Sequence, residues 1–222
     1  MLNYITINTA IEIVCFIFSL ICLINDSSWV WKSMILYLFV TCVVETLGII
    51  IPGPKNLISN HWLYNIFLLF EIGFTNLMFS YLLGQYTNSK PIIVIGLIIS
   101  TSVYIYEIVQ HSFFTYNYHT YTTTSVLFVF YSFYYYYLLL KDERYVRLKY
   151  SAEFWWVTGT LFFYFADTAS NIFYNELRKV VLWNGYHLTF YIFRVLNIIL
   201  YGCWSYSFIC RKWLTPTSKS LS

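Results

Sequence analysis

Charged residues are scarce in this sequence. Lys, Arg, Asp and Glu make up 10% of the 222 residues, against about 25% in a soluble domain. Hydrophobic residues account for 59%, and the mean hydropathy is +0.61. The net charge of +3 is too small and too scattered for a nucleic-acid-binding surface. The composition therefore predicts one integral membrane domain with the lipid bilayer as its surroundings.

The motifs of several well-known chemistries are also missing. The five cysteines include no CxxC pair, so neither a disulfide framework nor a cysteine-bound zinc ion is expected. There is no GxSxG, Walker A or GxGxxG motif, and no HxxxH or HExxH pair. The last apolar segment contains no lysine that could hold retinal as a Schiff base. No cofactor is expected, and the sequence does not decide whether the protein binds a metal ion. An enzyme is the less favoured interpretation.

Long apolar runs dominate what is present. Each of seven runs is long enough to cross about 30 Å of hydrocarbon as a helix, and the first lacks the basic start of a signal peptide. They predict an all-α, seven-transmembrane-helix bundle in a single domain over residues 1–210, followed by a short basic cytoplasmic tail, 211–222. The predicted spans are 4–24, 34–52, 62–84, 91–109, 121–140, 154–174 and 188–209.

The distribution of Lys and Arg predicts the orientation. With the N-terminus outside, three of these residues fall in outer loops: Lys55, Arg178 and Lys179. Nine fall in inner loops and the tail: Lys32, Lys90, Lys141, Arg144, Arg147, Lys149, Arg211, Lys212 and Lys219. Because cytoplasmic loops are enriched in basic residues, the N-terminus is expected outside and the C-terminus in the cytoplasm. The expected location is the plasma (inner) membrane, as a multi-pass protein.

A few ionisable residues lie inside the apolar runs. Arg194 cannot lose its proton, so it needs water or an anionic partner. Measured from each segment's midpoint at about 1.5 Å per residue, three glutamates fall within roughly 3 Å of the midplane, and Asp167 and Arg194 lie about 5–6 Å outward of the midplane. Glu107 lies about 10 Å out. The acids concerned are Glu12, Glu45, Glu71, Glu107 and Asp167.

Helical spacing adds three polar residues to this group. Asn171 follows Asp167 by one turn, and Tyr191 and Asn197 lie one turn either side of Arg194. Polar faces turned toward lipid are costly, so these faces are expected to converge inside the bundle. The simpler structural alternative is an Asp167–Arg194 pair that only joins two helices. The predicted ligand-binding set is Glu12, Glu45, Glu71, Glu107, Asp167, Asn171, Tyr191, Arg194 and Asn197.

The sequence favours a receptor or sensor over other membrane functions. An outward-facing polar pocket would bind a small polar or cationic ligand, or protons, and would signal through a separate partner protein. The basic stretch Lys141–Lys149 is the candidate docking loop, and a collar against anionic lipid explains it equally well. The first alternative is a proton-coupled small-molecule transporter that uses Glu45 and Glu71. A lipid-modifying membrane enzyme and an oligomeric pore or assembly factor are the remaining alternatives.

Overall fold

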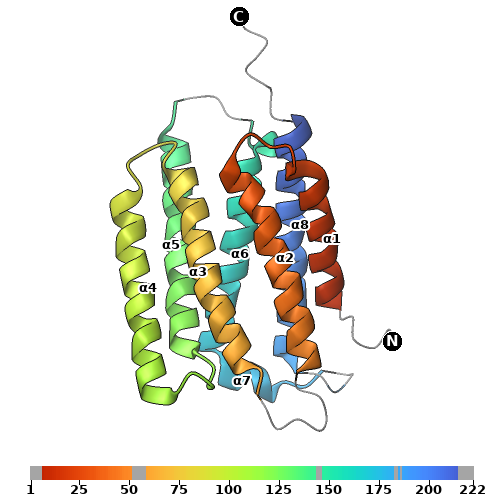
Figure 1. The fold of residues 1–222 in the computed structure, drawn as a ribbon, viewed down its shortest axis with the longest axis vertical. Coiled ribbons are helices and arrows are strands. Elements are labelled where there is room, and N and C mark those ends of the chain that lie inside the picture. The colour runs from red at the N-terminus through yellow and green to blue at the C-terminus, as the bar shows by residue number, and fades with distance from the viewer. Residues whose placement is uncertain (1–6, 52–58, 144–146, 183–184, 186, 215–222) are drawn as a thin grey trace, which may run out of the picture.

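The protein folds into a bundle of long helices. The computed structural model describes residues 7–51, 59–143, 147–182, 185 and 187–214. Its long helices are α1 (Ile7–Leu23), α2 (Trp29–Ile50), α3 (His61–Leu83), α4 (Lys90–His111), α5 (Tyr118–Lys141), α6 (Ala152–Ile172) and α8 (Leu188–Ile209). A short α7 (Tyr174–Lys179), a 3-10 turn η2 (Leu148–Tyr150) and a π-helical turn η3 (Cys210–Leu214) complete the helical elements of these residues. The predicted all-α fold is confirmed (Figure 1).

The predicted segments agree closely with the helices. The main shift is in α2, which begins at Trp29 rather than at residue 34. The sequence did not predict α7, nor that η3 continues α8 into the expected tail. By length and composition, α2, α3, α4, α5 and the combined α8 and η3 are able to cross a membrane, whereas α1 is shorter, at 17 residues. These helices make the chain a multi-pass membrane protein.

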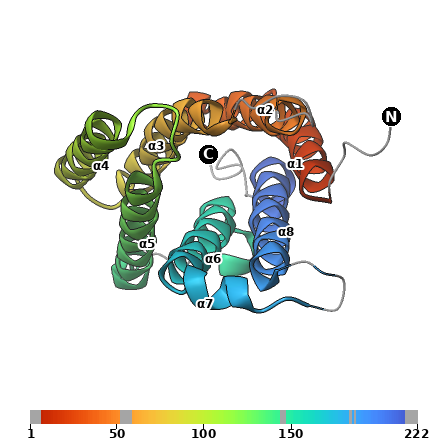
Figure 2. The same ribbon diagram turned by 90° about the horizontal axis from the view of Figure 1, so that it is seen from below.

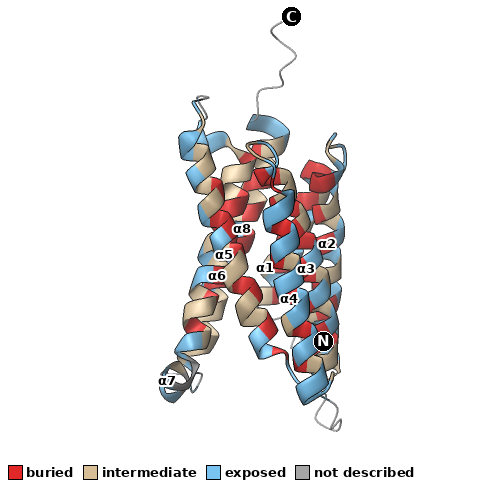
Figure 3. Cartoon of the chain, turned by 90° about the vertical axis from the view of Figure 1, so that its left-hand side faces the viewer, coloured by how far each residue is buried: buried red, intermediate tan, exposed pale blue. Residues whose placement is uncertain are grey.

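Most of the long helices form a ring (Figure 2). In order around it they are α1, α2, α3, α5, α6 and α8, and α1 packs against α8 to close it. α4 lies outside the ring, against α3 and α5. Buried residues lie mainly where helices face one another, and exposed residues lie on outward faces (Figure 3). We call the two ends of the bundle the α7 end, at the bottom of Figure 1, and the C-terminal end, at the top.

The half nearer the C-terminal end holds a dense aromatic core. Trp31 and Trp156 are fully buried, as are Phe79 and Phe208. Trp156 stacks on Trp204 with ring centroids 5.7 Å apart and planes 5° apart. The indole N–H of Trp204 donates to the backbone carbonyl of Trp156 at 3.3 Å, so its polar atom is satisfied within the core. This half is packed with large apolar side chains.

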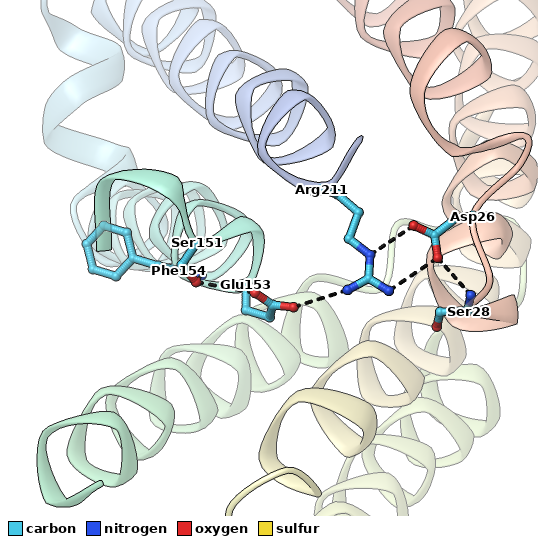
Figure 4. A network of polar contacts seen from close by, with 6 residues as sticks. All are labelled: Asp26, Ser28, Ser151, Glu153, Phe154 and Arg211. Atoms are coloured by element: carbon cyan, nitrogen blue, oxygen red, sulfur yellow. Dashed lines mark hydrogen bonds and ion pairs between the residues drawn. The ribbon is translucent and has the colours of Figure 1, made fainter. Parts of the chain in front are cut away.

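Polar contacts tie the elements together at the C-terminal end (Figure 4). Arg211 donates to both carboxylate oxygens of Asp26, at 2.9 and 3.2 Å, and lies 3.5 Å from the Glu153 carboxylate on α6. The Asp26 carboxylate also accepts from the backbone N–H of Ser28, at 2.7 Å. Burial raises the pKa of Asp26, but these hydrogen bonds and the charges of Arg211 and Lys32 outweigh it, so the pKa lies below its usual value. We call Asp26, Glu153 and Arg211 the clamp, which joins the α1–α2 loop, α6 and η3.

Candidate ligand-binding site

A partly enclosed cavity of about 240 Å³ lies in the half of the bundle nearer the α7 end. Its described lining comes from all six helices of the ring and from the α4–α5 loop, and includes no residue of α4. Tyr116, in that loop, is 43% exposed, so the cavity lies close to the protein surface at this end. Pockets for drug-sized ligands measure about 300–1,000 Å³, so this cavity suits a smaller molecule.

Three of the predicted acids meet in this cavity. Glu12 is 4% exposed, and its Oε2 has no hydrogen-bond partner among the described residues. Glu45 interacts with the hydroxyl of Tyr64, and Glu71 accepts a hydrogen bond from the hydroxyl of Tyr164 at 2.5 Å. Glu45 is near enough to both other glutamates for their charges to interact. No Lys, Arg or His occurs among the described lining residues, so three acids share one recess without a fixed counter-charge.

Aromatic rings form much of the remaining wall. The face of an aromatic ring carries partial negative charge and attracts cations. At the inner limit of the cavity, Tyr37 stacks on Phe74 with centroids 4.3 Å apart and meets Trp204 edge-on at 5.9 Å. Acidic groups and ring faces together favour a positively charged occupant. The aromatic lining residues are Tyr37, Tyr64, Phe67, Tyr116, Tyr121, Phe163, Tyr164 and Tyr201.

A buried asparagine on α3 holds the α4–α5 loop in place. Asn65 is fully buried, and its Nδ2 donates to the backbone carbonyls of Phe113 and Thr115, at 2.8 and 2.6 Å. Its Oδ1 accepts from the backbone N–H of Asn117 at 3.2 Å. These bonds pair backbone groups of the α4–α5 loop with a side chain of α3. They also place the intervening Tyr116 at the cavity.

Asp167 and Asn171, both on α6, lie beside the cavity rather than in its described lining. Asp167 is fully buried, and its Oδ2 accepts from the Ser125 hydroxyl of α5 at 3.1 Å and from Asn171 at 3.3 Å. Its charge interacts with that of Glu71 and its carboxylate with the hydroxyl of Tyr121, a lining residue. Asp167 thus lies behind the cavity wall and is linked to the cavity through Tyr121.

Glu107 does not join the cavity, contrary to expectation. It is 2% exposed, and its carboxylate accepts from the backbone N–H groups of His119 and Thr120, both at 2.8 Å, and from the Thr120 hydroxyl at 2.6 Å. These are N–H groups in the first turn of α5, which lack partners inside the helix. Because α4 lies outside the ring, Glu107 faces α5 and serves as its N-terminal cap.

Arg194 does not meet the acids either. Its guanidinium lies over the ring of Phe190, 4.3 Å from the centroid, and the described residues place no carboxylate within ion-pair distance of it. The Asp167–Arg194 pair, the simpler structural alternative, is therefore absent from this structure. Helical side chains point toward the N-terminus of their own helix, so Arg194 extends one turn toward the α7 end. Tyr191 is half-buried and is not in the described lining, whereas Asn197 is.

Several lining residues were absent from the predicted set. Tyr37 lies four and eight residues before Thr41 and Glu45, so helical spacing places all three on one face of α2. That signal was available in the sequence. Tyr116 is in a loop that side-chain contacts of Asn65 hold in place, and no spacing rule identifies it. Tyr121 was hidden in a helix in which many residues are Tyr or Thr.

The proposed docking stretch Lys141–Lys149 is only partly within the described residues, because 144–146 lie outside them. Its described ends are exposed at Lys141, Arg147 and Lys149. The backbone carbonyl of Lys149 accepts from the indole N–H of Trp155 at 3.0 Å and from the hydroxyl of Tyr206 at 3.3 Å. The end of this loop is therefore fixed to α6 and α8, while the side chains of Lys141 and Arg147 are exposed.

Comparison with protein-family models, with curated proteins and with solved structures finds no match for this chain.

Proposed function

We propose that the protein is a membrane receptor or sensor that binds a small organic cation in the acidic cavity. In this proposal the chain crosses the membrane seven times, with the N-terminus outside and the C-terminus in the cytoplasm. The α7 end then faces outward, in agreement with the excess of basic residues in loops at the opposite end. A separate protein would receive the signal, with Lys141–Lys149 as the candidate contact.

The observation that carries the proposal is the lining of the cavity. Glu12, Glu45 and Glu71 share it with eight aromatic side chains and with no described basic residue. Carboxylates buried without a counter-charge are costly, and a cation that enters between them removes that cost. Aromatic cages recognise ammonium groups through the same ring faces. A ligand with an anionic group finds no basic partner among these residues, which makes a zwitterion less suitable than a simple cation.

Thermal unfolding of the purified protein tests the proposal. Choline and a short primary amine are compared with neutral carbon isosteres, in which carbon replaces the charged nitrogen. At saturating ligand we expect a higher midpoint with the cations alone, because a ligand that binds only the folded state stabilises it. The control is Glu143→Gln, which removes an exposed acid at the C-terminal end. Equal effects of cation and isostere, or an unchanged response in a Glu12→Gln, Glu45→Gln, Glu71→Gln triple variant, would contradict the proposal.

The orientation is tested separately by labelling. In intact cells, a membrane-impermeant maleimide should react with a Ser59→Cys variant, in which the new thiol lies before α3 at the α7 end. It should not react with a Ser27→Cys variant, in which the thiol lies before α2 at the other end. Both positions are exposed in loops. The reverse pattern would invert the topology.

A proton-coupled transporter is the second candidate, favoured by a specific arrangement. The charges of Glu12, Glu45, Glu71 and Asp167 interact in sequence, from α1 across to α6. Such a series could pass protons. Transport also needs an opening at the C-terminal end, where the aromatic core and the clamp close the bundle. Uptake of a bound cation into proteoliposomes under a pH gradient would favour the transporter, and binding without uptake would favour the receptor.

A further inference from the structure

The outer face of α1 and α2 carries two adjoining apolar hollows. The first, of about 410 Å³, extends from Lys32 to Phe39 on α2, and the second, of about 390 Å³, continues to Leu47. Phe16 of α1 and Phe39 line both hollows, with ring centroids 5.9 Å apart. The α2 residues involved recur every three to four positions, so the hollows follow one face of the helix. Together they form a shallow, open groove along the α1–α2 seam.

The groove presents apolar surface along its length. Leu36 and Phe39 are more than half exposed, at 57% and 51%. Thr46 is polar, but its hydroxyl donates to the backbone carbonyl of Cys42 at 2.7 Å. It therefore does not need a hydrogen-bond acceptor from a molecule in the groove. In a membrane protein this outward surface contacts lipid. An acyl chain is the occupant that matches its apolar lining.

The end of the groove nearer the C-terminal end of the bundle carries a positive charge. Lys32 is exposed, and the described residues place no carboxylate within ion-pair distance of it, since Asp26 is held by Arg211. Trp29, one turn earlier, is 65% exposed, as expected of an aromatic anchor at the membrane surface. Ten residues separate Lys32 from Cys42 in the second hollow, about 15 Å along the helix, which is about the depth of one leaflet. The groove continues to Leu47, so it is long enough for an acyl chain whose headgroup lies at Lys32.

We propose that the α1–α2 groove is a binding site for an anionic phospholipid of the leaflet at the C-terminal end. The acyl chain fills the hollows between Phe16 and the outward face of α2, and the headgroup phosphate lies at Lys32. Anionic lipids are concentrated in the cytoplasmic leaflet, where the positive-inside rule places this end. The site is independent of the acidic cavity, which lies on the inner side of the same helices.

Native mass spectrometry of the full chain tests this site. The protein is released from nanodiscs of equal phosphatidylglycerol and phosphatidylcholine, and retained lipids are counted. We expect phosphatidylglycerol to be preferred, and Lys32→Gln to reduce that preference roughly fivefold, the effect of about one interfacial lysine. Lys90→Gln is the matched control, because Lys90 is an exposed lysine at the same end on α4.

A second variant tests the apolar part of the groove. Thr46→Trp fills the second hollow from an exposed position, and should reduce retention of both lipids without unfolding the protein. Equal retention of both lipids by the unaltered protein would overturn the proposal. So would an equal loss in Lys90→Gln and Lys32→Gln, or full retention in Thr46→Trp.

Discussion

The two halves of this bundle are built on opposite principles. Toward the C-terminal end, large aromatic side chains fill the interior, and charged groups pair in the clamp. Toward the α7 end, the same helices leave a cavity lined by tyrosines and by three acids that have no basic partner among its described lining residues. Dense packing stabilises a fold, whereas buried charge without a partner costs stability. The contrast indicates that the half nearer the C-terminal end maintains the fold, and it is the reason why we propose binding in the half nearer the α7 end.

The largest expected effect concerns the aromatic core. Trp156→Ala removes a fully buried ring that stacks on Trp204 and meets Phe79 edge-on at 5.4 Å. We expect a loss of about 3 kcal/mol in the free energy of unfolding, because the vacated space is only partly refilled. Reversible unfolding in mixed micelles measures it. Phe162→Ala on the exposed face of the same helix is the control, and an equal loss there would remove the distinction between core and surface.

Two buried acids, Glu107 and Glu71, allow a comparison between a residue outside the ring of helices and one that lines the cavity inside it. Glu107→Ala leaves the first N–H groups of α5 unpaired, and a charge-assisted contact of this kind contributes about 2 kcal/mol. Glu71→Gln keeps the shape of the side chain and removes a charge from the acidic recess. Without ligand, we expect Glu107→Ala to unfold at lower temperature, and Glu71→Gln to be unchanged or more stable. The opposite order in thermal unfolding would mean that the cavity acids hold the fold together.

Ligand affinity should differ between the Glu71 and Glu107 variants. A cation that contacts Glu71 loses a charged partner in Glu71→Gln, and we expect its affinity to fall about tenfold, or about 1.4 kcal/mol. Glu107→Ala should leave the affinity unchanged, because the cap lies outside the cavity. Titration calorimetry with the cation that raises the unfolding midpoint provides the measurement. A similar loss in both variants would place Glu107 in the binding site after all.

The smallest expected effect is that of acid on the clamp. The pKa of Asp26 is lower in the folded protein than its usual value, about 3.9 in an unfolded chain. Its carboxylate therefore adds stability above about pH 4, and this contribution is lost as the pH falls through the lowered pKa. For an ion pair that is partly exposed, we expect a loss of about 1 kcal/mol. Asp26→Asn should remove this acid dependence, and an unchanged pH profile in that variant would assign it to other groups.

The sequence predicts the helices well because lipid imposes a simple rule of length and apolarity. All seven long segments were found, and the shared faces of Glu12, Glu45 and Glu71 do meet. Depth along the membrane axis is readable from residue number, but position around the ring is not. Glu107 was misplaced for that reason, since nothing in its own segment indicates that α4 lies outside the ring.

The length of its side chain explains why the position of Arg194 was also predicted wrongly. Arg194 was placed by the depth of its Cα atom, yet its guanidinium lies about a full turn away, over Phe190. Long side chains near a helix start extend toward that end, so the charge and the backbone atom occupy different depths. Short side chains are less affected, and Asn197 lies where its spacing placed it. Charge maps of membrane helices should therefore be drawn from the tips of long side chains.

Tyr37 gives the two halves a common boundary. Its ring borders the cavity on one side and touches Trp204, a member of the packed aromatic core, on the other. The partition between the acidic recess and the packed aromatic core is thus one ring thick at this point. A ligand that displaces the ring of Tyr37 would therefore act, through the contact with Trp204, on the stacked pair of Trp204 and Trp156.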